Sequence, residues 1–102
     1  SLLFTGHVSG VPMVVLIDSG ASHNFISKVF AKMANVVVSP TSQFGATLGN
    51  GYQVTSSGIC REVVLSLGKF TVTTEAYAFD TGGPNLVLVM KLLKKLGYVL
   101  TN

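Results

Sequence analysis

The chain has 102 residues, of which 48% are hydrophobic and 11% are charged, and its formal net charge is +3. This length suits a single domain over residues 1–102, and the charged fraction is well below the roughly 25% typical of soluble domains. The single cysteine, Cys60, excludes an internal disulfide and a multi-cysteine metal site. No apolar run approaches the ~20 residues of a transmembrane helix, so no contact with a membrane is expected.

The seven basic residues do not form the dense basic and aromatic patch that is typical of nucleic-acid-binding proteins. Three of them, Lys91, Lys94 and Lys95, lie close together late in the chain, and we interpret them as the solvated face of a helix. Nucleic acid is therefore not expected as a partner. Because so small a domain cannot bury all of its apolar side chains, the composition favours an obligate oligomer.

Two strands are expected at the start of the chain, at about residues 2–8 and 13–17, and the second is apolar on both faces and ends at Asp18. A helix is expected over about residues 23–33, with Ser22 or Asn24 as its N-cap. Its apolar residues recur at helical spacing: Phe25, Ile26, Val29, Phe30 and Met33.

The middle of the chain contains a hairpin signal. Val36–Val38 is expected to form a short strand that Pro40 ends. Gly49-Asn50-Gly51 is a strong turn signal, and it predicts a hairpin over about residues 43–57. This hairpin carries few large apolar residues, so we expect it to be exposed rather than part of the core.

The remainder of the chain predicts further strands. Antiparallel strands are expected over about 59–67 and 70–79, and a buried strand at 86–88. A short helix over about 89–96, ended by Gly97, follows. The sum is a mostly-β protein with one or two short helices, which is typical of a barrel or a sandwich.

The most specific motif is Asp18-Ser19-Gly20-Ala21-Ser22, which follows an apolar strand. It resembles the active-site loop of aspartic proteases. The longer run Val15–Ser27 is similar to the retropepsin-type protease of gypsy-type LTR retrotransposons, including those of plants, and the resemblance covers nearly the whole chain. It implies an all-β, retropepsin-like closed barrel of one lobe, in which the hairpin at about 43–57 is the flap that covers the substrate.

The resemblance assigns roles to the residues of the motif. One carboxylate cannot be general base and general acid at once, whereas two aspartates close together share one proton. Since the chain supplies one such loop, a two-fold homodimer is expected to join two copies of Asp18, which activate a water. The implied site comprises the catalytic residue Asp18, the loop residues Ser19, Gly20, Ala21 and Ser22, and the flap residues Gly49, Asn50 and Gly51.

The resemblance therefore implies an aspartic endopeptidase that processes a retroelement polyprotein, bound as an extended peptide. No cofactor and no metal are expected. The resemblance also implies an intracellular protein, in the cytoplasm or within retroelement particles.

Two departures from the family leave an alternative open. Val89 replaces a Gly that the family usually has before its C-terminal helix, and Lys91 replaces an acid or amide. A Val at that point is expected to overpack the junction with the active-site layer by ~1–3 kcal/mol. The alternative is a retropepsin-like dimerisation or peptide-binding module with little or no catalytic activity.

Other candidate sites are weaker. Asp80 begins a second Asp-Thr-Gly, but the chain is too short for two lobes of about 100 residues, so we interpret Asp80 as part of a solvated turn. His7 and His23 have no ligand partners at metal-binding spacing, and we interpret them as strand and helix-start residues. Cys60 is interpreted as a buried thiol rather than a nucleophile.

Overall fold

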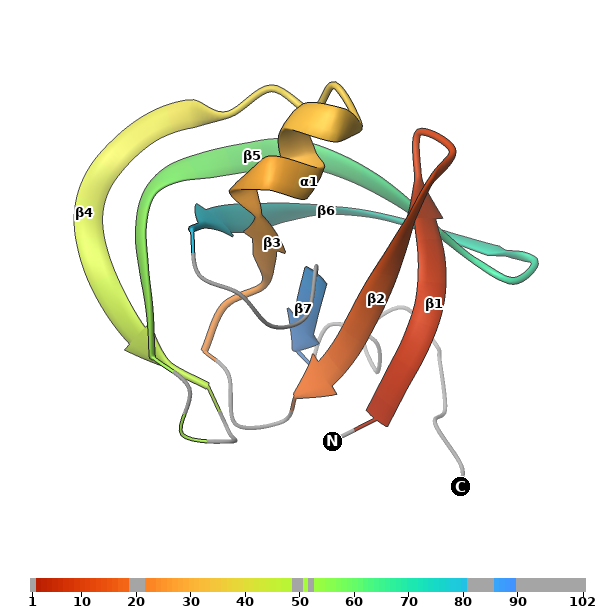
Figure 1. Ribbon diagram of the computed structural model, residues 1–102, viewed down its shortest axis with the longest axis horizontal. Helices are drawn as coiled ribbons and strands as arrows, with labels where there is room; N and C mark the ends of the chain where they lie inside the picture. Colours follow the sequence, from red (N-terminus) through yellow and green to blue (C-terminus); the bar gives the residue numbers. More distant parts are fainter. Residues whose placement is uncertain (1, 19–21, 49–50, 52, 81–85, 90–102) are drawn as a thin grey trace.

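The computed structural model describes residues 2–18, 22–48, 51, 53–80 and 86–89 (Figure 1). Seven strands and one helix lie in this part of the chain. In chain order they are β1 (Leu2–Val8), β2 (Val11–Asp18), β3 (Phe25–Ser27), α1 (Lys28–Met33), β4 (Ser39–Thr47), β5 (Gln53–Leu67), β6 (Phe70–Phe79) and β7 (Leu86–Val89). The expected mostly-β class is confirmed.

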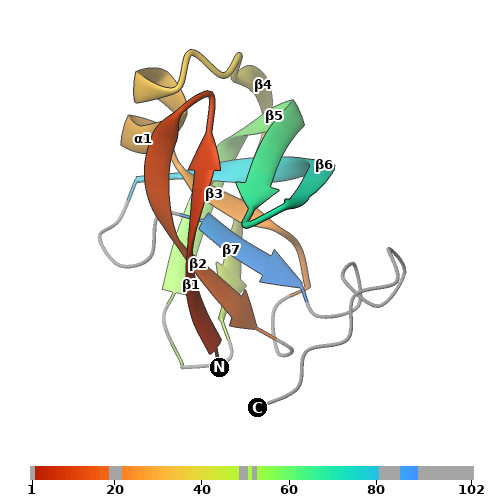
Figure 2. The ribbon, with the colours of Figure 1, turned by 90° about the vertical axis from the view of Figure 1, so that its right-hand side faces the viewer.

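All seven strands belong to one sheet, in the order β1-β2-β7-β3-β6-β5-β4. The long strands β4 and β5 bend strongly, so the sheet curls around its own interior (Figures 1 and 2). β1 also pairs with β5, through His7↔Ser66 and Val8↔Leu65. These two pairs do not close a complete barrel, and β4 remains at one end of the sheet, so full closure is the part of the expected fold that is wrong.

The centre of the sheet combines parallel and antiparallel pairing. β2 and β7 are parallel, β7 and β3 are antiparallel, and β3 and β6 are parallel. Figure 2 shows β7 lying beside the end of β2. Because parallel pairing requires a long connection rather than a tight turn, the end of β2 is held by segments that are distant in sequence.

The buried apolar side chains form two clusters. The larger fills the space between the β1–β2 hairpin, α1 and the far ends of β5 and β6, and comprises Val8, Met13, Val15, Ile17, Ile26, Ala31, Ala34, Cys60, Val63, Leu65 and Ala76. The smaller joins the β4–β5 hairpin to the middle of the sheet, and comprises Leu16, Phe25, Leu48, Val54 and Phe79. Most described residues of this hairpin are exposed, as expected, but Leu48 and Val54 belong to the core, so the expectation is wrong for these two side chains.

The helix is shorter than expected. It begins at Lys28, and Phe25–Ser27 forms β3, which pairs with β6 and β7. Ser27 occupies the N-cap position without a side-chain hydrogen bond, so neither Ser22 nor Asn24 is the cap. Strand pairing of β3 on both sides outweighs the helical spacing of its apolar residues. In the described part of the chain, no helix is long and apolar enough to span a membrane.

Two further boundaries differ from expectation. Val36–Val38 is irregular, and the strand begins only at Ser39 and continues through Pro40. Proline is tolerated there because β4 is an edge strand, where a missing N–H need not disrupt a ladder. Val89 ends β7 as a strand residue, and the rest of the helix expected at about 89–96 lies outside the described residues.

Candidate active site

Asp18 is the last residue of β2 and is 3% exposed. All four acidic residues of the chain lie in the described part, and the other three, Glu62, Glu75 and Asp80, are exposed. Burial of a carboxylate is unfavourable unless other groups compensate it, so packing of the core alone does not explain an aspartate at this position. The apolar strand places the acid at the edge of the core, at the start of the expected catalytic loop.

Asp18 pairs in register with Val89 across the parallel β2–β7 ladder. The residue that departs from the family's usual glycine is therefore the direct backbone neighbour of the expected catalytic acid. Lys91, the other departure, lies outside the described residues.

Of the expected loop residues, Ser19, Gly20 and Ala21 lie outside the described residues, and Ser22 is exposed. The Oγ of Ser22 lies 2.8 Å from Nδ1 of His23. His23 is exposed and precedes β3, so it is not a helix-start residue.

Asn24 fixes the end of this loop to β6, a role that sequence reasoning missed. Its side-chain amide donates to Thr74 Oγ1 (3.0 Å) and to the backbone oxygen of Glu75 (3.2 Å). The backbone N–H of Tyr77 donates to the backbone oxygen of Asn24 (2.9 Å). The partners lie about fifty residues away along the chain, so no local pattern in the sequence could have indicated them.

The expected flap residues lie in the chain between β4 and β5. Gly49 and Asn50 lie outside the described residues. Gly51 has a φ of +84°, in the left-handed region that glycine adopts without strain. Its N–H donates to the backbone oxygen of Leu48 (2.9 Å), as in a tight turn.

Four rings meet where this hairpin approaches the end of the loop: His23, Phe25, Phe44 and Tyr77. The tightest pair is Phe44 with Tyr77, whose ring centroids lie 4.9 Å apart at an interplanar angle of 87°. His23 lies 5.2 Å from Tyr77 and 5.6 Å from Phe44. The cluster thus joins the loop, β4 and β6.

Comparison with known proteins gives the family of the chain. A profile of the family described as retroviral aspartyl protease matches residues 2–101. The chain belongs to this family. The retropepsin-type resemblance of its sequence is thereby confirmed, while the narrower assignment to gypsy-type elements stays a prediction.

Two of the solved structures that match the chain show the same fold at low sequence identity. EIAV protease, solved with the inhibitor HBY-793, matches with a TM-score of 0.70 at 17% identity, over 99% of this chain and 92% of that chain. The retroviral protease-like domain of Ddi1 from Leishmania major matches with a TM-score of 0.67 at 17% identity, over 92% of this chain and 76% of that chain. A search of curated proteins found no match.

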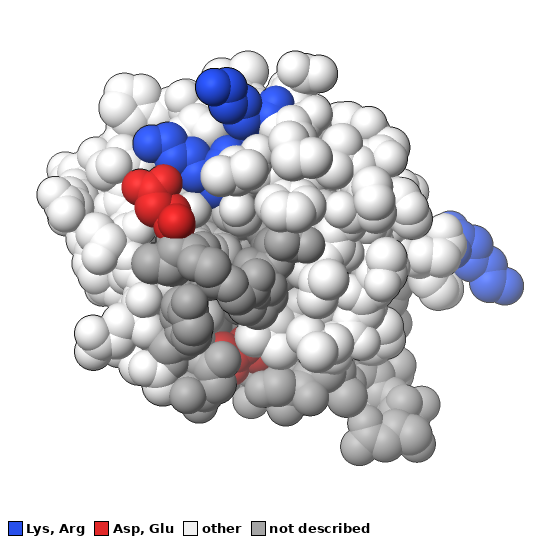
Figure 3. Space-filling view, viewed as in Figure 1, with Lys and Arg blue, Asp and Glu red and all other residues white. Residues whose placement is uncertain are grey.

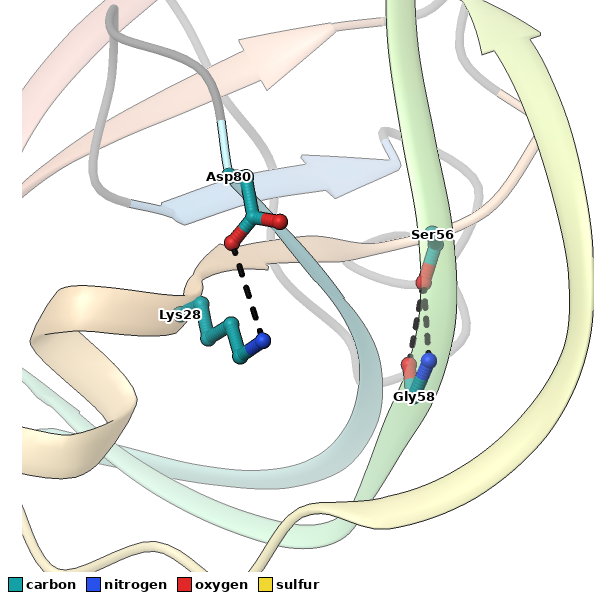
Figure 4. A network of polar contacts seen from close by, with 4 residues as sticks. All are labelled: Lys28, Ser56, Gly58 and Asp80. Carbon is teal, nitrogen blue, oxygen red and sulfur yellow. Dashed lines mark hydrogen bonds and ion pairs between the residues drawn. The ribbon is translucent and has the colours of Figure 1, made fainter.

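A hollow of about 470 Å³ lies at the base of the β4–β5 hairpin, and its lining includes Lys28, Ser57, Gly58 and Asp80. Figure 4 shows Lys28 and Asp80 facing each other, with their charged atoms 3.9 Å apart. Both side chains are mostly exposed, at 61% and 74%, so this ion pair contributes little to stability. Asp80 is thus a solvated residue, as expected, and Asp18 does not line this hollow.

On the opposite side of the same view, β5 is braced by a buried hydroxyl (Figure 4). Ser56 Oγ donates to the backbone oxygen of Gly58 (3.0 Å) and accepts from its N–H (3.4 Å). Ser56 is 2% exposed, so these bonds satisfy a polar group that would otherwise be buried without a partner.

The remaining candidate groups do not assemble into a second site. Cys60 is fully buried, and burial raises the pKa of its thiol, so the thiolate is disfavoured as expected. His7 is exposed on β1. Basic side chains in the space-filling view gather in a small group over α1 (Figure 3). Within the described ranges, no three His, Cys, Asp or Glu residues could hold a metal ion.

Proposed function

We propose that this retroviral aspartyl protease is an endopeptidase that acts as a homodimer, with Asp18 of each copy forming a shared catalytic pair. The observation that carries the proposal is the burial of Asp18 at the end of β2, while the other three acids of the chain are exposed. A second buried carboxylate must therefore come from a second copy. A two-fold axis beside the end of β2 supplies one.

The chemistry follows from two carboxylates at close range. Two like charges a few ångströms apart are not ionised together, so the pair holds one proton. The ionised Asp18 takes a proton from water as the water attacks the scissile carbonyl. The protonated Asp18 of the other copy donates its hydrogen bond to the carbonyl oxygen, and the roles then reverse to protonate the leaving amine.

Exposed apolar residues on the β1–β2 hairpin support association. Leu3, Phe4 and Val14 are 66%, 40% and 44% exposed, on the hairpin that carries Asp18. Side chains of this kind favour a protein–protein interface. Membership of the retroviral aspartyl protease family supports the same arrangement, since such proteases act as dimers on polypeptide substrates.

The proposed substrate is the polyprotein of a gypsy-type retroelement, bound as an extended chain beneath the hairpin tips of the two copies. The resemblance of the Asp18 motif and its flanks to that group supports this choice. We further propose that processing takes place in the cytoplasm or within the particles of the element.

A second candidate is a dimeric peptide-binding module with little turnover. It is favoured by the position of Val89, which pairs with Asp18 at the point where the family usually has glycine.

The test is cleavage of a mixed peptide library at pH 4 to 7, read by mass spectrometry, with Asp18→Asn as the inactive variant. Asp80→Asn is the matched control, because it alters the exposed acid of the second Asp-Thr-Gly. We expect Asp18→Asn to abolish cleavage and Asp80→Asn to preserve it. Cleavage that survives Asp18→Asn would refute the protease mechanism.

Sedimentation at micromolar concentration tests the dimer, and an active protein that sediments only as a monomer would refute the shared site. An inactive wild-type protein that is dimeric and binds library peptides would favour the second candidate.

A further inference from the structure

The β4–β5 hairpin is attached to the rest of the molecule next to the catalytic loop. Leu48 and Val54, one on each side of the hairpin tip, are 3% and 2% exposed and belong to the smaller apolar cluster. Their partners include Leu16, two residues before Asp18, and Phe25, which begins β3. The hairpin therefore packs against both chain segments that flank the loop.

The solvent-facing rim of this attachment is aromatic. Phe44 of β4 is half-buried and packs edge-to-face on Tyr77 of β6. The exposed ring of His23 lies against both of them, at 5.6 Å from Phe44 and 5.2 Å from Tyr77. Ring pairs at 4.5–7 Å in tilted or edge-to-face geometry are attractive beyond the burial of their area. His23 is thus the contact through which the loop side of the site touches the rim of the hairpin.

The orientation of the ring is fixed from the loop side as well. Ser22 Oγ lies 2.8 Å from Nδ1 of His23, and Asn24, on its other side, is bonded to β6. The residues before and after His23 thus restrain it, so its ring is held towards Phe44 and Tyr77 at little further cost in conformational entropy.

We propose that His23 is a positioning residue that docks the β4–β5 hairpin onto the segment following the catalytic loop, by ring packing on Phe44 and Tyr77. The docking concerns the folded chain itself, and its effect on turnover rests on the proposed protease function. Loss of the ring favours the undocked hairpin. In the protease, the undocked hairpin covers the substrate less well, so substrate binding weakens while Asp18 keeps its place.

The chain offers matched variants for the test. His23→Ala removes the ring, and His23→Phe keeps an aromatic ring without the imidazole nitrogens. His7→Ala removes the other histidine, which is exposed on β1. The primary measurement is amide hydrogen exchange by mass spectrometry, because exchange reports the population of locally open states. Exchange is compared between two regions. The first is the hairpin, measured at Phe44–Thr47 and Gln53–Ser56, and the second is Val63–Leu65, in β5 beyond the hairpin.

We expect His23→Ala to speed exchange in the hairpin by about 2- to 10-fold, the range that the loss of one ring contact gives. Exchange at Val63–Leu65 should stay unchanged. His7→Ala should exchange as the wild type does. His23→Phe keeps the ring packing but loses the contact with Ser22, so its exchange should lie much closer to the wild type than that of His23→Ala. Unchanged hairpin exchange in His23→Ala would overturn the proposal. Equal acceleration in both segments would overturn it too, because it would mean a general loss of stability.

Peptide cleavage provides the second readout. We expect His23→Ala to raise KM by a similar factor with kcat nearly unchanged, and His23→Phe to restore KM. A fall in kcat at constant KM would contradict a positioning role. The two proposals can be refuted separately. An inactive wild-type protein with the expected exchange pattern refutes the protease function alone. An active protein in which His23→Ala leaves hairpin exchange unchanged refutes the docking alone.

Discussion

Gly58 lies in β5 at the base of the hairpin, where the backbone passes close to Val38. A Cβ at this position would lie 2.6 Å from Cγ1 of Val38, 3.4 Å from the backbone oxygen of Ser39 and 4.0 Å from Cβ of Ala78. Real Cβ atoms do not approach other heavy atoms as closely as 2.6 Å, so Gly58→Ala forces Val38 to move. Val38 is β-branched, and its stiff χ1 limits how it can yield.

Overpacking of this kind costs about 1–3 kcal/mol. Gly58 does not have the left-handed φ of Gly10, Gly51 and Gly68, so its backbone accepts alanine without strain. Alanine also lowers the conformational entropy of the unfolded chain, which stabilises the protein by up to ~1 kcal/mol. The net expectation is a loss of about 1–2 kcal/mol in the free energy of unfolding. For a domain of this size each kcal/mol corresponds to a fall of about 4–8 °C in Tm.

The assay is urea and thermal unfolding at one fixed protein concentration, which removes the effect of association on Tm. Gly45→Ala in β4 is the control, since its nearest contact would be an ordinary 3.8 Å, and it should be neutral or stabilising. Val38→Ala removes the clashing atom, so the double variant Val38→Ala with Gly58→Ala should recover about 1–2 kcal/mol relative to additivity. Equal stability of the two glycine variants, or strict additivity in the double variant, would refute the reasoning.

Three further predictions concern the surroundings of Asp18 and the core. Asn24→Ala loses two side-chain hydrogen bonds to β6 and should cost about 1–3 kcal/mol in urea unfolding; a loss below ~0.5 kcal/mol would contradict the anchoring role. Burial raises the pKa of the Cys60 thiol above its ordinary 9.0, so its stabilising contribution is complete below pH 9 and falls above it by up to ~1.4 kcal/mol per pH unit. Cys60→Ala should remove that part of the pH dependence of the free energy of unfolding between pH 8 and 10. An identical pH dependence in both proteins would refute this contribution of Cys60. The sequence expectation that valine overpacks this position predicts that Val89→Gly, at the register partner of Asp18, increases peptide cleavage. It also predicts a net gain of about 1–2 kcal/mol in stability after the cost of glycine in a strand, and a destabilised variant would refute that expectation.

The elements that sequence reasoning located correctly are those defined by local signals. The strands expected at about residues 2–8 and 70–79 have the bounds of β1 and β6. The position of Asp18 at the end of an apolar strand was also predictable, because a carboxylate interrupts an otherwise apolar run.

The errors occur where pairing with a distant strand decides the conformation. Phe25–Ser27 lies between β6 and β7, and both partners are at least fifty residues away, so the helical spacing that begins at Phe25 was misleading. Pro40 was expected to end a strand, but the edge position of β4 accommodates it. The ties of Asn24 to β6 have the same origin, and only the folded chain brings these residues together.

The two separate apolar clusters have a thermal consequence. The smaller cluster can separate while the larger one stays intact, since the hairpin contributes Leu48 and Val54 to the smaller cluster alone. Separation wets leucine and phenylalanine side chains, so it carries a positive heat-capacity change, as unfolding does on a larger scale. The equilibrium between docked and undocked hairpin is therefore curved in temperature, and the protein should undock its hairpin on cooling as well as on warming.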